Sequence, residues 1–231
     1  MGGNIKKGMA VAGRWACGLA LCWSAAGAFA AQMLNVYAIP SAPVVQLVDE
    51  TSKQLATFGM ESFYRQGRPV HVTLYMTSFP DGSEAAVKQA VQQLAENLAP
   101  LPLQAQGFTV TKGNWAFIDV VSGRELQRLA DKVTLALAPL REPNPPLPAW
   151  VKAYPGKLAA FERYGSPNVF QNFEPHLTLL AAEQNPRLQA FGQLMQKQVP
   201  QARGEVIGLG IGLSDEWGQQ RQVLAEYFFR Q

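Results

Sequence analysis

The sequence contains little cysteine and little histidine. Its two cysteines, Cys17 and Cys22, both lie within the first thirty residues, so the rest of the chain has no thiol. Disulfides, cysteine metal ligands and cysteine nucleophiles are therefore excluded from that remainder. The chain also has only two histidines, His71 and His176, which excludes any site built on three or more histidines.

No hydrophobic run near the N-terminus is long enough for an ordinary membrane-spanning helix. The run from Trp15 to Ala30 is about sixteen residues, below the roughly 18 to 20 that cross a bilayer. Lys6, Lys7 and Arg14 precede its main part, and it ends in Ala28-Phe29-Ala30, the small-residue pattern of a signal peptidase site. We expect residues 1–30 to be a cleaved secretory signal and the product to be periplasmic or secreted. An uncleaved membrane anchor is the alternative.

The chain beyond this segment has no excess of either charge. The three basic residues of the signal belong to the 20 Lys and Arg of the whole sequence, which leaves seventeen against 17 Asp and Glu. A neutral protein has no global field to attract a long polyanion. We therefore expect the partner to be a small phosphorylated nucleotide or a short oligonucleotide, with no long nucleic acid and no stable membrane association.

Length and composition predict one domain of ordinary size. Residues 31–231 come from a chain with 48% hydrophobic residues, enough for a single core. We expect these residues to form one domain and the protein to be a monomer.

Alternating and helical hydrophobic periodicities follow one another along the chain. They predict strands at 33–39, 69–76, 108–111, 116–120, 175–180, 206–213 and 222–229, and helices at 44–58, 81–98, 126–137, 157–164 and 188–195. Ser122-Gly123-Arg124-Glu125 has the pattern of a capping box before the third helix. The proline-rich segment 142–148 predicts a stiff connection between two halves of the chain. This order indicates an α+β fold, in which helices and strands are mixed along the chain and antiparallel sheets are flanked by helices.

Both histidines begin the same short motif. His71-Val72-Thr73-Leu74 and His176-Leu177-Thr178-Leu179 each place a threonine two residues and a leucine three residues after the histidine. On a strand, residues i and i+2 share a face, so each motif directs an imidazole and a hydroxyl to one side and its leucine to the other. An imidazole can take up a proton in one copy and donate one in the other near neutral pH. The hydroxyls can hold phosphate oxygens.

These two motifs resemble those of the 2H phosphoesterases, a superfamily that includes 2′-5′ RNA ligase-like proteins and cyclic nucleotide phosphodiesterases. The approach Phe173-Glu174-Pro175 to the second motif is also similar. The resemblance implies a two-lobed, pseudo-symmetric fold with a central cleft, the two motifs on paired central strands, and metal-independent chemistry at phosphorus without a cofactor. It also implies that His71 and His176 are catalytic and that Thr73 and Thr178 bind substrate.

Three other interpretations of the motif residues remain open at this point. A single histidine on a half-buried strand is more often structural than catalytic. The two histidines could bind a metal ion together with a carboxylate such as Glu174, although zinc sites usually take three or four protein ligands. The chain could also be an exported nucleotide- or phosphate-binding protein without turnover.

Overall fold

A computed structural model describes residues 1–2 and 31–230 of the chain. The predicted signal peptide therefore lies, apart from Met1 and Gly2, outside the described residues, as do both cysteines. In the part of the chain that is described, no helix is both long and apolar enough to cross a membrane.

Seven strands of the described residues form one sheet in which every pairing is antiparallel. The strands are β1 (Gln32–Pro40), β2 (Val72–Phe79), β3 (Leu101–Val110), β4 (Ala116–Val120), β5 (His176–Leu180), β6 (Gln201–Ser214) and β7 (Gln220–Phe228). The α-helices are α1 (Ala42–Thr57), α2 (Glu84–Glu96), α3 (Arg124–Leu137), α4 (Pro155–Tyr164) and α5 (Leu188–Gln198). The predicted α+β class with antiparallel pairing is confirmed.

The long strand β6 joins the two halves of the sheet. The strand order is β2-β1-β6-β3-β4-β5, and β7 also pairs with β6. The first part of β6 pairs with β3, and its later part pairs with β1 and β7. Strands β2 and β5 therefore lie at the two ends of the hydrogen-bonded order.

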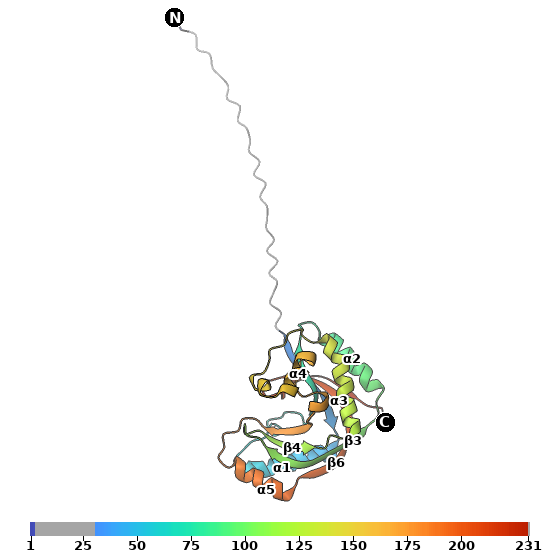
Figure 1. Cartoon of the computed structure of the whole chain (residues 1–231), viewed down its shortest axis with the longest axis vertical. Helices are drawn as coiled ribbons and strands as arrows, with labels where there is room; N and C mark the ends of the chain where they lie inside the picture. The colour runs from blue at the N-terminus through green and yellow to red at the C-terminus, as the bar shows by residue number, and fades with distance from the viewer. Residues whose placement is uncertain (3–30, 231) are drawn as a thin grey trace.

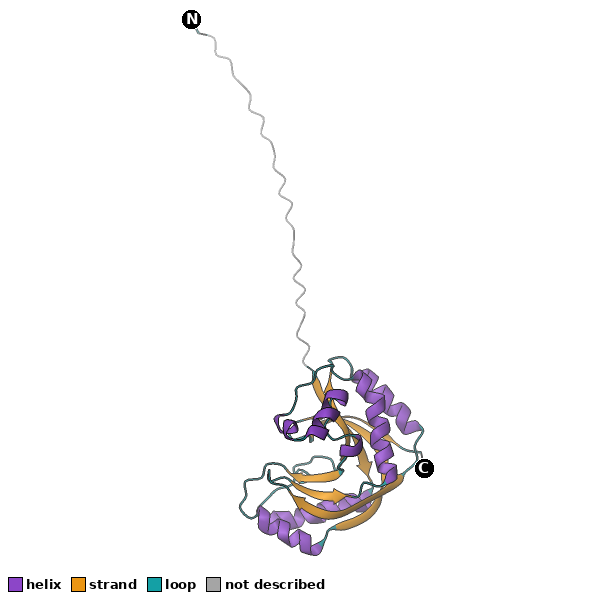
Figure 2. Ribbon diagram, viewed as in Figure 1, coloured by secondary structure: helices purple, strands orange, loops and turns teal. Residues whose placement is uncertain are grey.

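The sheet curves between two groups of helices. Helices α1 and α5 lie together on one side of the molecule, and α2 and α3 lie on another (Figure 1). The strands form a bent layer with these helices outside it (Figure 2), and α4 lies beside the opening of the bend, in the same half as α2 and α3 (Figure 1). This bend brings the two ends of the strand order toward each other.

The predicted elements are all present, but several boundaries differ. Strand β3 begins at Leu101, earlier than expected, and β2 begins at Val72 rather than at Pro69. The predicted capping box is wrong: Gly123 is the N-cap residue of α3 and no side chain caps the helix. The Ser122 hydroxyl instead points to the amide oxygen of Gln127 at 3.5 Å, because the helix begins one residue later than the motif requires.

Glycines on β6 leave room for the side chains of Tyr37 and Gln220 to pack directly against the backbone of this strand. A Cβ atom at Gly210 would overlap the ring of Tyr37, and one at Gly212 would overlap the side-chain amide of Gln220. The alternating glycines predict such close packing from the sequence. Tyr37 and Gln220 occupy that space, and Tyr37 in turn packs beside the first motif histidine.

Candidate active site

His71 lies at the entrance to β2 and is almost fully buried, with 6% of its surface exposed. Its Nδ1 is 3.0 Å from the carbonyl oxygen of Pro69, two residues earlier. The Tyr37 ring packs edge-on against the imidazole, with 5.5 Å between the ring centroids. The backbone of its own segment and a neighbouring strand thus fix the orientation of His71.

His176 is the first residue of β5 and is partly exposed. Its Nδ1 is 2.8 Å from the carbonyl oxygen of Glu174, which is again two residues earlier. The Phe117 ring from β4 lies 4.1 Å from the imidazole, centroid to centroid. The surroundings of the two histidines differ, but the hydrogen bond that orients each ring is the same.

This shared hydrogen bond determines the tautomer of both rings. A carbonyl oxygen can only accept, so Nδ1 must donate and must carry the proton in the neutral imidazole. The lone pair is then on Nε2 in both copies. Each histidine therefore presents Nε2, and not Nδ1, as the atom that can exchange a proton with a ligand.

The two motifs meet across the bend of the sheet and not on adjacent strands. The prediction that they lie on paired central strands is wrong, because β2 and β5 are the terminal strands of the hydrogen-bonded order. The two strands nevertheless contact each other. The Phe63 amide of the segment before the first motif also donates to the Leu179 carbonyl at 3.0 Å. Curvature of the sheet, rather than strand pairing, brings the motifs together.

One small cavity is lined by residues of both motifs. His71 and Thr178 line it from the two ends of the strand order, together with Val48, Phe63, Tyr64, Arg68, Pro69, Val70, Leu177 and Gln219. The other two predicted site residues, Thr73 and His176, do not line this cavity. Thr73 and Thr178 are partly buried, and Leu74 and Leu179 are buried in the core as the alternation predicts. The Thr73 hydroxyl accepts a hydrogen bond from the Asn35 side-chain amide, with Nδ2 and Oγ1 2.8 Å apart.

Burial lowers the pKa of both histidines. Burial, together with a smaller effect of His176, lowers the pKa of His71 to about 4, against the opposing effects of the Pro69 carbonyl and Asp215. Burial also lowers the pKa of His176 below its ordinary 6.5, while the Glu174 carbonyl and the carboxylates of Glu174 and Asp119 act in the opposite direction. Burial therefore favours the neutral form of both imidazoles.

Arg68 brings a positive charge to the cavity and was not predicted from the sequence. Its guanidinium donates from Nη1 to the Gln220 carbonyl at 3.0 Å, and Nη2 is 3.6 Å from Oδ2 of Asp215. The signal in the sequence was only that an arginine stands three residues before the first motif histidine. Such a position is not diagnostic, because most arginines lie on the solvated surface.

Two further polar residues, Tyr75 and Arg141, have structural roles. Tyr75 is buried and its hydroxyl donates to the Tyr164 carbonyl, so it anchors the segment that carries α4. Arg141 donates to the carbonyls of Glu142, Pro143 and Arg163.

Glu174, the carboxylate considered as a third metal ligand, has a different partner. The Glu174 carboxylate forms an ion pair with Lys157 at 2.9 Å. Among residues 1–2 and 31–230, no group of three or more His, Cys, Asp and Glu side chains is arranged to hold a metal ion. A wider open groove beside Gln32, Lys88 and Arg221 includes no motif residue.

Comparison with known proteins identifies the family. The model of the 2′-5′ RNA ligase superfamily matches residues 40–216, which include both motifs. A comparison with curated proteins gave no match.

Solved structures of low sequence identity share the fold. TT0787 of Thermus thermophilus is 18% identical, with a TM-score of 0.56 over 86% of this chain and 98% of that chain. LigT of E. coli in its apo form is 14% identical, with a TM-score of 0.52 over 87% of this chain and 99% of that chain. A further structure, described as a phosphoesterase, is 12% identical, with a TM-score of 0.50 over 87% of this chain and 100% of that chain.

The family match and the sequence motifs agree. The model spans most of the chain, and the resemblance in the motifs points to the same superfamily. Membership supports phosphoesterase- or ligase-like activity. This chain belongs to the 2′-5′ RNA ligase superfamily of 2H phosphoesterases.

Proposed function

We propose that this protein is an exported, metal-independent phosphoesterase that opens a small 2′,3′-cyclic phosphate or a 2′-5′ phosphodiester. The observation that carries the proposal is the identical orientation of the two imidazoles. Each Nδ1 donates to the carbonyl of the residue two positions earlier, which leaves Nε2 available in both rings. Two such groups around one phosphate form an acid–base pair.

His71 acts as the base in this reaction. Its pKa of about 4 keeps Nε2 unprotonated at neutral pH. Nε2 takes a proton from water while the water oxygen forms a bond to phosphorus. Nε2 is therefore in the form that a general base requires over a wide pH range.

His176 acts as the acid. Burial lowers the pKa of His176, against the opposing effects of the Glu174 and Asp119 carboxylates, and an anionic phosphodiester bound beside the ring would favour its protonated form. As the bond between phosphorus and the leaving 2′ or 3′ oxygen breaks, Nε2–H of His176 transfers its proton to that oxygen. His71 ends protonated and His176 neutral, and exchange with solvent restores both.

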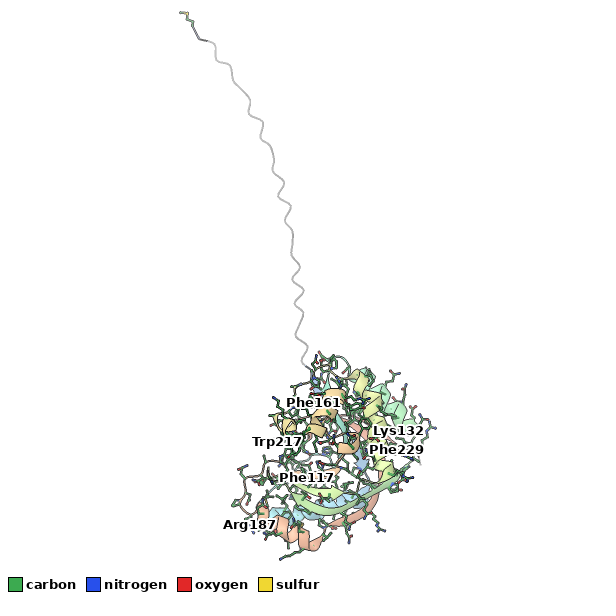
Figure 3. All side chains as sticks on the ribbon, in the orientation of Figure 1. Phe117, Lys132, Phe161, Arg187, Trp217 and Phe229 are labelled. Atoms are coloured by element: carbon green, nitrogen blue, oxygen red, sulfur yellow. The ribbon has the colours of Figure 1, made fainter. Side chains whose placement is uncertain are left out.

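A row of aromatic rings beside His176 supports a substrate that carries a nucleobase. Phe117 packs on His176, Trp115 lies 6.1 Å from Phe117, and Trp217 lies 5.9 Å from Trp115, between ring centroids. Trp217 comes from the turn between β6 and β7, whereas Phe117 lies on β4, and both lie on the same side of the molecule (Figure 3). Trp217 is 38% exposed. Bases stack on such rings with little sequence preference.

Substrate profiling of the purified protein tests this proposal. We expect hydrolysis of 2′,3′-cyclic nucleotides or of 2′-5′ dinucleotides, undiminished by a chelator. We also expect glycerol 1,2-cyclic phosphate, which has the cyclic ester but no base, to react with a lower kcat/KM. Activity that disappears with chelator and returns with a divalent ion would support the metal-dependent alternative, and tight nucleotide binding without product would support the binding protein.

Export is a separate part of the proposal and rests on residues 1–30. Lys6 and Lys7 before the apolar run and Ala28 and Ala30 at its end support cleavage after Ala30. N-terminal sequencing of the protein recovered from outside the cytoplasm should begin at Ala31. Recovery of the intact N-terminus in a membrane fraction would instead identify the segment as an anchor.

A further inference from the structure

Asn35 is a fully buried polar side chain between apolar residues of a strand. It lies on β1 between Leu34 and Val36, and its exposed surface is 0%. Burying an amide costs free energy unless its polar atoms are hydrogen-bonded. Among the described residues Nδ2 has two partners and the buried Oδ1 has none, so the contacts of Nδ2 indicate the role of this side chain.

The Asn35 amide lies between the first motif and the turn that carries Trp217. Its Nδ2 is 2.8 Å from Oγ1 of Thr73 on β2 and 3.2 Å from the carbonyl oxygen of Gly218, the residue after Trp217. One side chain thus contacts both the hydroxyl beside His71 and the backbone of the aromatic turn.

The Gly218 carbonyl fixes which way the Asn35 amide points. A carbonyl oxygen only accepts, so the atom facing it must be the NH₂ group and not Oδ1. The two protons of Nδ2 are then directed to Gly218 and to Thr73. Thr73 Oγ1 must accept from Asn35, and its own proton is directed elsewhere.

The direction of this hydrogen bond matters for a phosphate ligand. Phosphate oxygens only accept, so a threonine can hold them only by donating its proton. A threonine that donated to a neighbouring acceptor would present lone pairs to the phosphate and repel it. Asn35 prevents this arrangement because it offers Thr73 a donor and no acceptor.

We propose that Asn35 is a positioning residue that holds the Thr73 hydroxyl as a hydrogen-bond donor to the substrate phosphate, through its Nδ2 contacts with Thr73 Oγ1 and the Gly218 carbonyl. The inference rests on the proposed function, in which Thr73 binds phosphate. Neither the motif nor its spacing includes Asn35, which lies 38 positions from Thr73.

A double-mutant cycle with inorganic phosphate as the probe tests this role. We expect Asn35→Ala to weaken phosphate binding about tenfold in the otherwise unchanged protein. The Thr73 hydroxyl is then no longer held as a donor, and its hydrogen bond to the charged phosphate is lost. In the Thr73→Val background the same change should weaken binding less than about twofold, because no hydroxyl is left to orient. Calorimetry gives the four dissociation constants, and thermal unfolding gives the stability of each variant.

Thr134→Val is the matched control. It removes a buried side-chain hydrogen bond, from Thr134 Oγ1 to the Ala130 carbonyl at 2.9 Å on α3. It should lower the melting temperature and leave phosphate affinity unchanged. Equal losses of phosphate affinity for Asn35→Ala with and without Thr73 would overturn the proposal, since Asn35 would then act independently of the hydroxyl.

Should Asn35→Ala fail to fold, Asn35→Asp provides the same cycle. A carboxylate keeps the size of the side chain but accepts the Thr73 proton. Thr73→Val must then cost less phosphate affinity in that background than in the unchanged protein, and an equal cost overturns the proposal. The two proposals fail separately: a protein that binds phosphate with this coupling but turns over no ester refutes only the phosphoesterase, whereas turnover with additive effects refutes only the role of Asn35.

Discussion

Replacing either motif histidine is expected to reduce turnover by a factor on the order of 10² to 10⁴, because each change removes one partner of a proton-transfer pair. His71→Ala and His176→Ala should show this loss in kcat, measured on the cyclic nucleotide that the protein hydrolyses fastest. The fold should persist, since within the described part of the chain neither ring forms a hydrogen bond beyond that to the carbonyl two residues earlier.

A matched variant separates loss of chemistry from loss of packing. In His71→Asn the side-chain amide can still donate to the Pro69 carbonyl, but no group replaces Nε2. This variant should be as inactive as His71→Ala while retaining more of the wild-type stability. Activity of His71→Asn close to that of the wild type would mean that His71 only supports the structure.

The pH dependence of kcat/KM is expected to be bell-shaped, with its maximum below pH 6.5. As the pH falls, activity should be lost through about pH 4, where His71 becomes protonated and can no longer act as the base. As the pH rises, activity should be lost through a pKa below the ordinary 6.5, where His176 loses the proton it must donate.

Comparing kcat with kcat/KM tests this assignment further. The profile of kcat/KM reports the free protein and that of kcat reports the substrate complex. The negative charge of a bound phosphodiester should raise the pKa of His176, so the alkaline limb of kcat should lie at higher pH than that of kcat/KM. A profile that is flat from about pH 4 to about pH 8 is incompatible with acid–base catalysis by these two groups.

Local periodicity predicts an element well where that element buries one face. On β5, Leu177 and Leu179 are buried while Thr178 between them is only partly buried. Strand β1 is buried on both faces, since Asn35 and Tyr37 are buried as well as Leu34 and Val36. Helix capping was predicted less well, since the Ser122 pattern is also compatible with a start at the next residue. The residue at which a helix begins depends on the local backbone geometry, which a short sequence pattern does not determine.

The way the motifs meet could not be predicted from the sequence. The spacing of His71 and Thr73 determines their shared strand face, but the strand order depends on which strands β6 pairs with along its length. A curved sheet can bring its terminal strands together, as β2 and β5 show. Arg68 lies just before the first motif and Asn35 lies on β1, which pairs with β2, but no short-range pattern in the sequence marks either of them.

The most direct test of the two-histidine mechanism is single-turnover hydrolysis of a 2′,3′-cyclic nucleotide by the chelator-treated protein and by the double variant His71→Ala/His176→Ala. We expect the chelator-treated protein to retain full activity, and the double variant to be no more than slightly slower than the slower single variant, because the two histidines act as one unit. Loss of activity in the chelator-treated protein, or hydrolysis by the double variant at the wild-type rate, would contradict this mechanism.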